Sequence, residues 1–291
     1  MPSPLFCPLA DGRQLAYDVH GPAGAPAVLA FHGSPGSRLD FWPSPAMPLG
    51  ALEPPVRLVA VDRPGVGQST HQPGRTLTDW ANDVAQLVDH LELPRFCVLG
   101  YSGGGAYALQ VAAALPHRVK RVALAGAVAP PEGRSMDDGS GLGPRLGFEL
   151  VRYAGVVAKV GFTVANRALA VVPDLALALG TADMCAADRQ LLRTPALREN
   201  RVAAYREAAR NGPSGAVHDV ALVASNWGFS LDEVTAPTTV WAGADDNFVP
   251  LAQTRHLVDA LRHSRLMLLP HTGHTLLFSH APQIFADLVD A

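Results

Sequence analysis

The stretch Gly100-Tyr101-Ser102-Gly103-Gly104 reads Gly-x-Ser-x-Gly, and it lies where the character of the chain changes. An apolar run over residues 96–99 precedes it, and a helix-like segment over residues 106–114 follows it. This order predicts a strand, a sharp turn and a helix, with the Ser102 hydroxyl exposed at the tip of the turn. Small residues suit such a turn because it brings strand and helix close together, and glycine tolerates the unusual backbone angles.

The composition is that of an ordinary globular chain. Its 291 residues are 48% hydrophobic and 17% charged, enough for one large α/β domain with an insertion or for two domains. The formal net charge is −3, from 23 basic and 26 acidic residues. Such a chain has no basic field that could hold phosphate backbones, so nucleic acid is not an expected partner.

Cysteine usage and the N-terminal sequence indicate a cytoplasmic protein. The three cysteines, Cys7, Cys97 and Cys185, lie far apart and form no Cys-x-x-Cys pair, so we expect reduced thiols. The first residues lack the basic and apolar regions of a signal peptide. No apolar run is long enough to cross a bilayer, so no membrane partner is expected.

Strand and helix patterns alternate over the first part of the chain. Apolar positions over residues 77–91 fall on one face at a period of 3.6, which predicts a helix. A second helix follows Ser102. The predicted strands cover residues 5–9, 14–19, 27–31, 56–61, 96–99 and 119–126.

The pattern changes between residues 130 and 230. This region carries helical patterns over residues 145–160 and 195–210 and no clear strand, so it predicts a helical cap inserted after the sixth strand. Strand and helix then alternate again. The later predicted elements are strands at 238–242 and 265–269 and helices at 250–261 and 282–288.

Alternating strands and helices are typical of an α/β fold with a mostly parallel central sheet and helices on both faces. We expect a core of residues 1–129 and 231–291 and a cap of residues 130–230. In such sheets the chemistry gathers at the carboxyl ends of the strands. Polar residues of this kind follow five predicted strands: His32, Asp62, Ser102, Asp246 and His274.

A serine hydroxyl needs a neighbouring base to become a nucleophile, and that base needs a third group to hold its tautomer. After Ser102, the chain offers these groups in the order acid, then base. The acid lies in the stretch with adjacent Asp245 and Asp246, and the base is His271 or His274.

These motifs together resemble the α/β-hydrolase family with a cap domain, nearly from end to end. The resemblance rests on four motifs: His32-Gly33-Ser34-Pro35-Gly36, Asp62-Arg63-Pro64-Gly65-Val66-Gly67-Gln68-Ser69, the stretch around Ser102, and Gly243, Asp246 and Pro250 with Gly273-His274. It implies a triad of Ser102, Asp246 and His274 in preference to Asp245 and His271. Asp232 lies where some family members place the acid.

The resemblance also implies the rest of the site. The backbone N–H groups of Ser34 and Gly103 would bind the oxyanion, and no metal or organic cofactor is required. His32 and Asp62 are interpreted as structural. Tyr101, Trp227 and Phe229 are candidates for the substrate pocket, although hinge or core packing explains the last two equally well.

Ser102 as the nucleophile excludes dehalogenases and epoxide hydrolases, which carry an Asp at this position. The first expectation is hydrolysis of a small or medium apolar carboxylic ester, a small-molecule substrate. The alternatives are carbon–carbon bond hydrolysis, haloperoxidase-like esterase activity, a proline-iminopeptidase-like aminopeptidase, or a ligand receptor on the same fold. An exposed apolar face of the cap could serve a homodimer or a lid.

Overall fold

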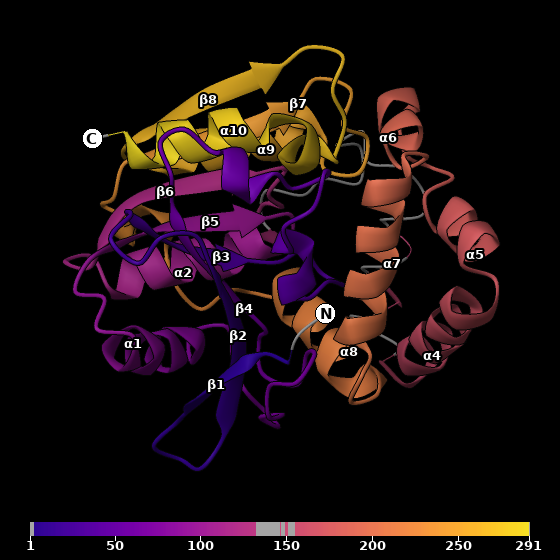
Figure 1. Ribbon diagram of the computed structural model, residues 1–291, viewed down its shortest axis with the longest axis horizontal. Coiled ribbons are helices and arrows are strands. Elements are labelled where there is room, and N and C mark those ends of the chain that lie inside the picture. The colour runs from indigo at the N-terminus through magenta and orange to yellow at the C-terminus, as the bar shows by residue number, and fades with distance from the viewer. Residues whose placement is uncertain (1–2, 132–145, 147–148, 151–154, 291) are drawn as a thin grey trace.

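The structure is a computed structural model that describes residues 3–131, 146, 149–150 and 155–290. Its central sheet is built from the strands β1 (Leu5–Pro8), β2 (Gln14–His20), β3 (Ala27–Phe31), β4 (Arg57–Val61), β5 (Phe96–Tyr101), β6 (Val119–Ala125), β7 (Thr238–Gly243) and β8 (Ser264–Leu269). The spatial order is β1-β2-β4-β3-β5-β6-β7-β8 (Figure 1). β2 pairs antiparallel with β1 and β4, and the other pairings are parallel.

The parallel register brings the loops of the site to one edge of the sheet. Phe31 of β3 lies beside Gly100 of β5, and Gly100 lies beside Leu124 of β6. The loops that follow these strands therefore leave the sheet side by side. The α/β fold with a mostly parallel sheet, predicted from the sequence, is confirmed.

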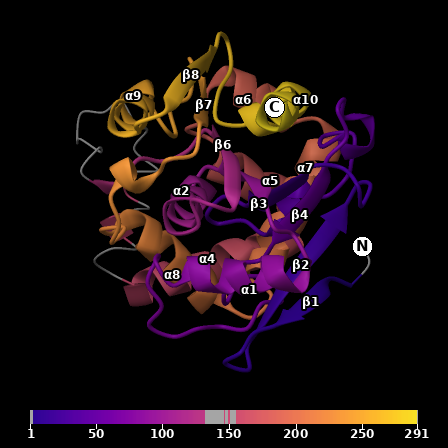
Figure 2. The ribbon, with the colours of Figure 1, turned by 90° about the vertical axis from the view of Figure 1, so that its left-hand side faces the viewer.

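Helices cover both faces of the sheet (Figure 2). The helices α1 (Trp80–His90), α2 (Gly104–Ala114) and α9 (Leu251–Ala260) pack over one apolar cluster. On the other face lie α10 (Leu276–Val289) and two short 3-10 helices, Arg38–Phe41 and Leu49–Ala51. The apolar side of α1 is buried, as its sequence pattern predicts. The helix begins at Trp80 rather than at residue 77, where the pattern begins.

The chain between β6 and β7 forms a helical insertion beyond the carboxyl ends of the strands (Figure 1). Its described helices are α4 (Gly155–Val171), α5 (Pro173–Gly180), α6 (Ala186–Leu191), α7 (Pro195–Ala208) and α8 (Pro213–Ala224), and we call them the cap. In α5, α7 and α8 the first residue is proline, whose missing N–H has no intrahelical partner at that position anyway. The division of the chain at residues 130 and 230 stays a prediction.

Two predicted helices differ from the structure. Residues 145, 147–148 and 151–154 of the helix predicted over 145–160 lie outside the described residues, and α4 runs from Gly155 on to Val171. The last helix begins at Leu276 instead of residue 282, because two helical segments join across a kink at His280, where φ is −127°. Pro282 begins the second segment, so the sequence pattern located only the part after the kink.

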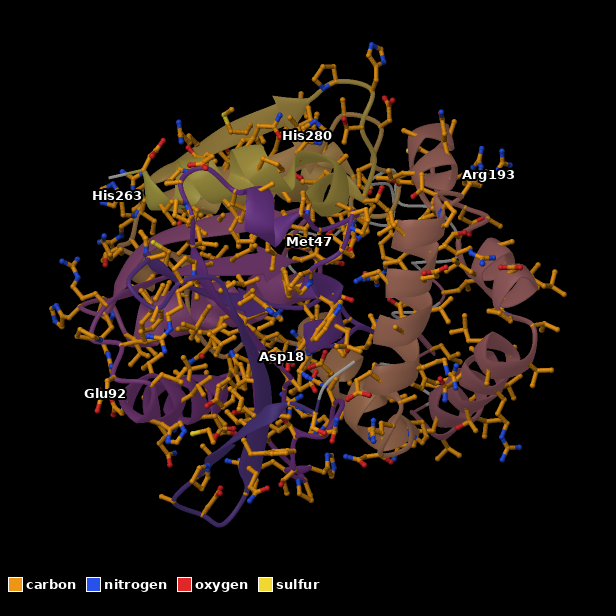
Figure 3. The ribbon with its side chains drawn as sticks, in the orientation of Figure 1. Asp18, Met47, Glu92, Arg193, His263 and His280 are labelled. Carbon is orange, nitrogen blue, oxygen red and sulfur yellow. The ribbon has the colours of Figure 1, made fainter. Side chains whose placement is uncertain are left out.

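Buried and exposed side chains separate as expected for a globular protein. Met47 and Asp18 lie inside the molecule, whereas Glu92, Arg193 and His263 project from its surface (Figure 3). No helix of the described residues is long and apolar enough to cross a membrane. Exposed apolar side chains gather on the outer cap helices: Val156, Val157, Val160, Val164, Val171, Leu175 and Leu179. The predictions of a homodimer and of a cytoplasmic location stay predictions.

Candidate active site

Ser102 lies at the sharp turn between β5 and α2. Its φ is +53°, a left-handed backbone conformation that costs free energy in a residue with a side chain and is often found at functional sites. Two hydrogen bonds hold the turn: the Ser102 N–H donates to the Ala125 carbonyl, and the Ser102 carbonyl accepts from Gly105 N–H. The hydroxyl is thereby held beyond the end of the strand.

His274 and Asp246 complete a continuous chain of hydrogen bonds with this serine. His274 Nε2 lies 3.0 Å from Ser102 Oγ, and His274 Nδ1 lies 2.9 Å from Asp246 Oδ2. The second oxygen of Asp246 accepts hydrogen bonds from the backbone N–H groups of Phe248 and Val249, both 2.8 Å long. The carboxylate is therefore fixed on one side by the backbone and presents its other oxygen to the imidazole.

The surroundings of His274 favour its protonated form. Burial lowers the pKa of its imidazole, but the charge of Asp246 and its hydrogen bond outweigh burial, so the pKa lies above its usual value. The rings of Tyr101 and Phe248 pack against the imidazole, with centroids 5.6 and 4.8 Å away. This arrangement stabilises an imidazolium, the charge that appears when a serine proton is taken up.

The competing acids and bases lie elsewhere. Asp245 and His271 are exposed, whereas Asp246 and His274 are buried. Asp232 forms an exposed ion pair with Arg262, 3.2 Å long. Of the alternatives weighed from the sequence, only Asp246 and His274 therefore join the hydrogen-bonded chain.

Two backbone N–H groups lie where the resemblance places an oxyanion site. A Cβ on Gly103 would lie 2.7 Å from Ser34 Oγ and 3.3 Å from Ser34 N, so a glycine at 103 lets the two loops meet. Among the described residues, neither the Ser34 nor the Gly103 N–H has a hydrogen-bond acceptor within reach. Unpaired amides beside a nucleophile are donors ready for a developing negative charge.

The loop that carries Ser34 is held by Arg63. Its guanidinium donates hydrogen bonds to the carbonyls of His32, 2.6 Å, and Gly33, 3.0 Å. Burial and the nearby Arg63 charge hold the pKa of His32 well below its usual value, so the ring is neutral and structural. Asp62 accepts hydrogen bonds from the backbone N–H groups of Arg38 and Gln68 and stabilises its own turn.

A cap residue that sequence reasoning missed joins this loop. Asp219 of α8 accepts a hydrogen bond from Ser34 Oγ, 2.5 Å, and pairs with Arg63 through both of its carboxylate oxygens. Tyr107 and Arg75 also donate to it. Burial disfavours its charge, but the Arg63 charge and hydrogen bonds outweigh burial, so the pKa of Asp219 lies far below its usual range. The signal in the sequence was a lone carboxylate in an otherwise apolar helix.

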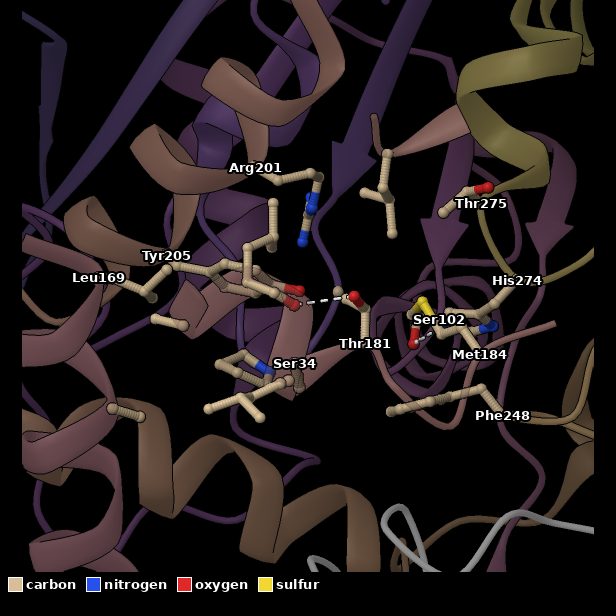
Figure 4. Close-up of a pocket in the computed structure, with 18 of the residues that line it drawn as sticks. Ser34, Ser102, Leu169, Thr181, Met184, Arg201, Tyr205, Phe248, His274 and Thr275 are labelled. Carbon is tan, nitrogen blue, oxygen red and sulfur yellow. Dashed lines mark hydrogen bonds between the residues drawn. The ribbon is translucent and has the colours of Figure 1, made fainter. Parts of the chain in front are cut away.

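Ser102 and His274 lie at one end of a cavity of about 510 Å³ between core and cap (Figure 4). Its walls are mostly apolar. The core contributes Gly33, Ser34, Pro35, Tyr101, Phe248 and Thr275, and the cap contributes Phe162, Ala165, Asn166, Ala168, Leu169, Ala176, Leu177, Leu179, Gly180, Thr181, Met184, Leu192, Arg201 and Tyr205. Tyr101 thus lines this cavity, and its role in substrate binding stays a prediction.

Trp227 and Phe229, the other two pocket candidates, lie outside this cavity. Their rings stack on each other with centroids 5.9 Å apart, and Trp227 belongs to the apolar core. They border a separate surface depression beside Asp232. The packing interpretation, not the pocket interpretation, fits their position.

Arg201 of α7 brings a positive charge to the wall of the cavity (Figure 4). It is 5% exposed and donates a 2.5 Å hydrogen bond to Asp40, whose other oxygen accepts from the Gly33 N–H. A buried charge is tolerated only when it is paired, and Asp40 supplies the pairing. In the described part of the chain, no three His, Cys, Asp or Glu side chains gather where they could hold a metal ion.

The comparisons with known proteins agree with this geometry. A family model described as alpha/beta hydrolase fold matches residues 26–281. The chain belongs to the alpha/beta hydrolase fold family. It is therefore a hydrolase of this fold, and the substrate class is a separate question.

Two relatives and one solved structure illustrate the range of this family. A Variovorax paradoxus protein named "Putative carbamate hydrolase RutD" is 31% identical, with 95% of each chain covered. The 2-hydroxy-6-oxo-2,4-heptadienoate hydrolase of Pseudomonas putida is 28% identical, covering 87% of this chain and 83% of its own. An alpha/beta hydrolase fold protein from Nakamurella multipartita shares the fold with a TM-score of 0.71 at 23% identity, with 99% of each chain covered.

Proposed function

We propose that this protein is a serine hydrolase that cleaves small or medium apolar carboxylic esters through an acyl-enzyme. The observation that carries this proposal is the continuous hydrogen-bonded chain Ser102–His274–Asp246 beside the unpaired amides of Ser34 and Gly103. A nucleophile, a base, an orienting acid and two oxyanion donors are the groups that acyl transfer needs, and they lie together at one end of a cavity.

In the first half of the reaction, Ser102 Oγ attacks the acyl carbon while His274 Nε2 takes the hydroxyl proton. The carbonyl oxygen becomes negatively charged and is stabilised by the N–H groups of Ser34 and Gly103. The tetrahedral intermediate then collapses, the bond to the alcohol oxygen breaks, and His274 gives its proton to that oxygen. The alcohol leaves, and the acyl group stays on Ser102.

In the second half, water takes the place of the alcohol. His274 removes a proton from the water as it attacks the acyl carbon, and the same two N–H groups stabilise the negative oxygen. The bond to Ser102 Oγ breaks, the serine regains its proton from His274, and a carboxylic acid is released. Asp246 stabilises the imidazolium in both halves.

The cavity supports the apolar preference. A volume of about 510 Å³ is in the range of pockets that enclose small ligands, and side chains such as Leu169, Leu177 and Met184 line it. An apolar acyl or alcohol chain gains free energy by leaving water for such walls. A carbamate, the class in the name of the Variovorax relative, also has a carbonyl carbon that Ser102 could attack, with a carbamoyl group in place of the acyl group on the serine.

Carbon–carbon bond hydrolysis is the second candidate, because Arg201 favours it. Its buried guanidinium brings a positive charge to the mostly apolar lining of the described cavity, and it would attract a negatively charged substrate group. The name of the Pseudomonas putida relative specifies such a substrate, a dienoate. Asp40 already neutralises Arg201, however, so the apolar ester stays the first proposal.

The test is turnover of p-nitrophenyl esters from acetate to decanoate by the wild type and by Ser102→Ala. We expect repeated turnover by the wild type, with a preference for apolar chains of short or medium length. The Ser102→Ala variant should fold normally and lose at least about 10⁴-fold in kcat, because the nucleophile is gone.

A dicarboxylic monoester and a 2-hydroxy-6-oxo-dienoate complete the substrate series. Higher kcat/KM for these two substrates than for every apolar ester would move the assignment to an anionic substrate bound by Arg201. Hydrolysis retained in the Ser102→Ala variant would exclude the proposed nucleophile. Binding of one ester equivalent without turnover would favour the ligand-receptor alternative.

A further inference from the structure

The backbone of the candidate base is held by a carboxylate from the cap. Asp188 of α6 is 1% exposed, and its Oδ2 accepts a 2.8 Å hydrogen bond from the His274 N–H. Its Oδ1 accepts hydrogen bonds from the Thr275 N–H, 2.8 Å, and from the Thr275 hydroxyl, 2.6 Å. One side chain of the cap thus binds two consecutive amides of the loop that carries His274.

Gly273 makes this approach feasible. A Cβ at position 273 would lie 2.2 Å from Asp188 Oδ2 and 2.4 Å from Cys185 Sγ, closer than such atoms can come. The Cys185 thiol itself donates a weak 3.5 Å hydrogen bond to Asp188. The glycine before the histidine therefore has a physical reason in this chain, since it leaves room for the cap carboxylate.

We propose that Asp188 is a positioning residue that sets the place of His274 from the cap side. This inference rests on the proposed role of His274 as the base. Asp246 holds the imidazole through Nδ1, and Asp188 holds the backbone N–H of the same residue. His274 is therefore held at both its side chain and its main chain. A base must stay within hydrogen-bond reach of its proton donor, and a small displacement costs rate.

The charge of Asp188 also acts on the imidazole. The charged groups that face His274 are Asp246 from the loop after β7, Asp188 from α6 and Arg201 from α7. The two carboxylates favour the imidazolium, and Arg201 opposes it. Tyr101 of β5, which packs on the imidazole, and Cys185, just before α6, are uncharged at neutral pH. Removing the Asp188 charge should therefore lower the pKa of His274.

The decisive variant is Asp188→Asn. Its amide keeps the shape of the carboxylate but loses the charge and turns an NH₂ group towards a backbone donor. We expect kcat to fall by about 10- to 100-fold with little change in KM, and the acid limb of the kcat/KM profile to move to lower pH. A variant that folds with wild-type kcat and an unmoved acid limb would overturn the proposal.

Asp174→Asn is the matched control. Asp174 lies on the neighbouring cap helix α5, its side chain is 71% exposed, and it pairs with Arg198 outside the cavity. The Asp174→Asn substitution removes one negative charge from the cap, as Asp188→Asn does, but at a residue that does not contact the His274 loop. Both kcat and the pH profile should stay as in the wild type, and an equal shift in this variant would count against a specific role of Asp188.

Hydrogen exchange of the loop amides is a readout that needs no substrate. In Asp188→Asn, and to a smaller extent in Thr275→Val, the His274 and Thr275 amides should exchange faster than in the wild type. If Asp188→Asn fails to fold, unchanged exchange in Thr275→Val would refute the proposal that Asp188 holds the His274 loop. If the wild type hydrolyses no ester, the proposed function fails, and exchange still decides whether Asp188 holds the loop.

Discussion

The core and the cap contribute to the site by different routes. In the core, Ser102, Asp246 and His274 come within a few residues of a strand end, so the connectivity of the sheet brings them to one edge. In the cap, Asp188 reaches the loop of His274 and Asp219 reaches the loop of Ser34, through contacts that span more than 80 residues of chain.

This difference teaches how the cap is fixed in place. A buried charge needs a partner, and two buried cap charges find theirs in the core: Asp219 pairs with Arg63, and Arg201 pairs with Asp40. Apolar contacts are non-directional and allow several arrangements of two surfaces. These ion pairs require one arrangement of cap and core, because each charged group must meet its partner. These pairs therefore tie the cap to the loops of the core.

The sharpest test of the core half of the comparison is Asp246→Asn beside Asp245→Asn. Asp246→Asn should lower kcat by roughly 10³- to 10⁴-fold, because the amide favours the wrong tautomer of His274. Asp245 is exposed and makes no contact with the imidazole, so its variant should stay within about twofold of the wild type.

Steady-state kinetics on the preferred ester measures both variants. A larger loss in Asp245→Asn than in Asp246→Asn would assign the orienting acid to the other residue. Equal, small losses would mean that the imidazole is held without either carboxylate, and the proposed triad would be reduced to a pair.

The core half of the candidate site is accessible to sequence patterns for a physical reason. Ser102, Asp246 and His274 each lie in a short local pattern with glycine or proline at fixed spacing, and a parallel sheet gathers strand ends without further information. The unpaired amides of Ser34 and Gly103 follow from the same local patterns. Their place at the edge of the sheet is thus largely encoded within a few residues of each motif.

The cap half could not be predicted in the same way. Trp227 and Phe229 were candidates for the pocket because they lie where the cap rejoins the core, yet they stack outside the cavity. The predicted site residues did not include Asp188, Arg201 or Asp219, because a charged residue on a helix is usually exposed to water. Only the three-dimensional packing of distant segments shows that all three are buried, that Arg201 and Asp219 form ion pairs, and that Asp188 accepts hydrogen bonds from the His274 loop.

The next test breaks the attachment of the cap to the core. Asp219→Asn should lower the free energy of unfolding by roughly 3 kcal/mol, because it leaves the buried Arg63 and Arg75 without a counter-charge. Ser34→Ala is the control, since it removes one hydrogen bond from the same carboxylate and should cost about 1 kcal/mol. Chemical denaturation measures both.

If Ser34→Ala proved as destabilising as Asp219→Asn, the hydrogen bond rather than the charge would dominate this contact. Ser34→Ala keeps the backbone N–H that is proposed to bind the oxyanion. Its kcat therefore reports separately on whether the Asp219 contact orients that N–H, and a several-fold loss without a matching loss of stability would show that it does.

The smallest expected effects are those of Phe248→Ala, which should change kcat/KM, and of Phe229→Ala, which should change stability. Phe248 lines the cavity and packs on the His274 ring, so Phe248→Ala should lower kcat/KM by about tenfold. Phe229 packs against Trp227 outside the cavity, so Phe229→Ala should cost roughly 1–3 kcal/mol of stability and leave kcat/KM within about twofold. Thermal unfolding and kinetics on one ester series distinguish the two effects. A changed acyl-chain preference in Phe229→Ala would return that residue to the pocket, as the sequence first suggested, and would mean that the cavity extends past its present wall when substrate binds.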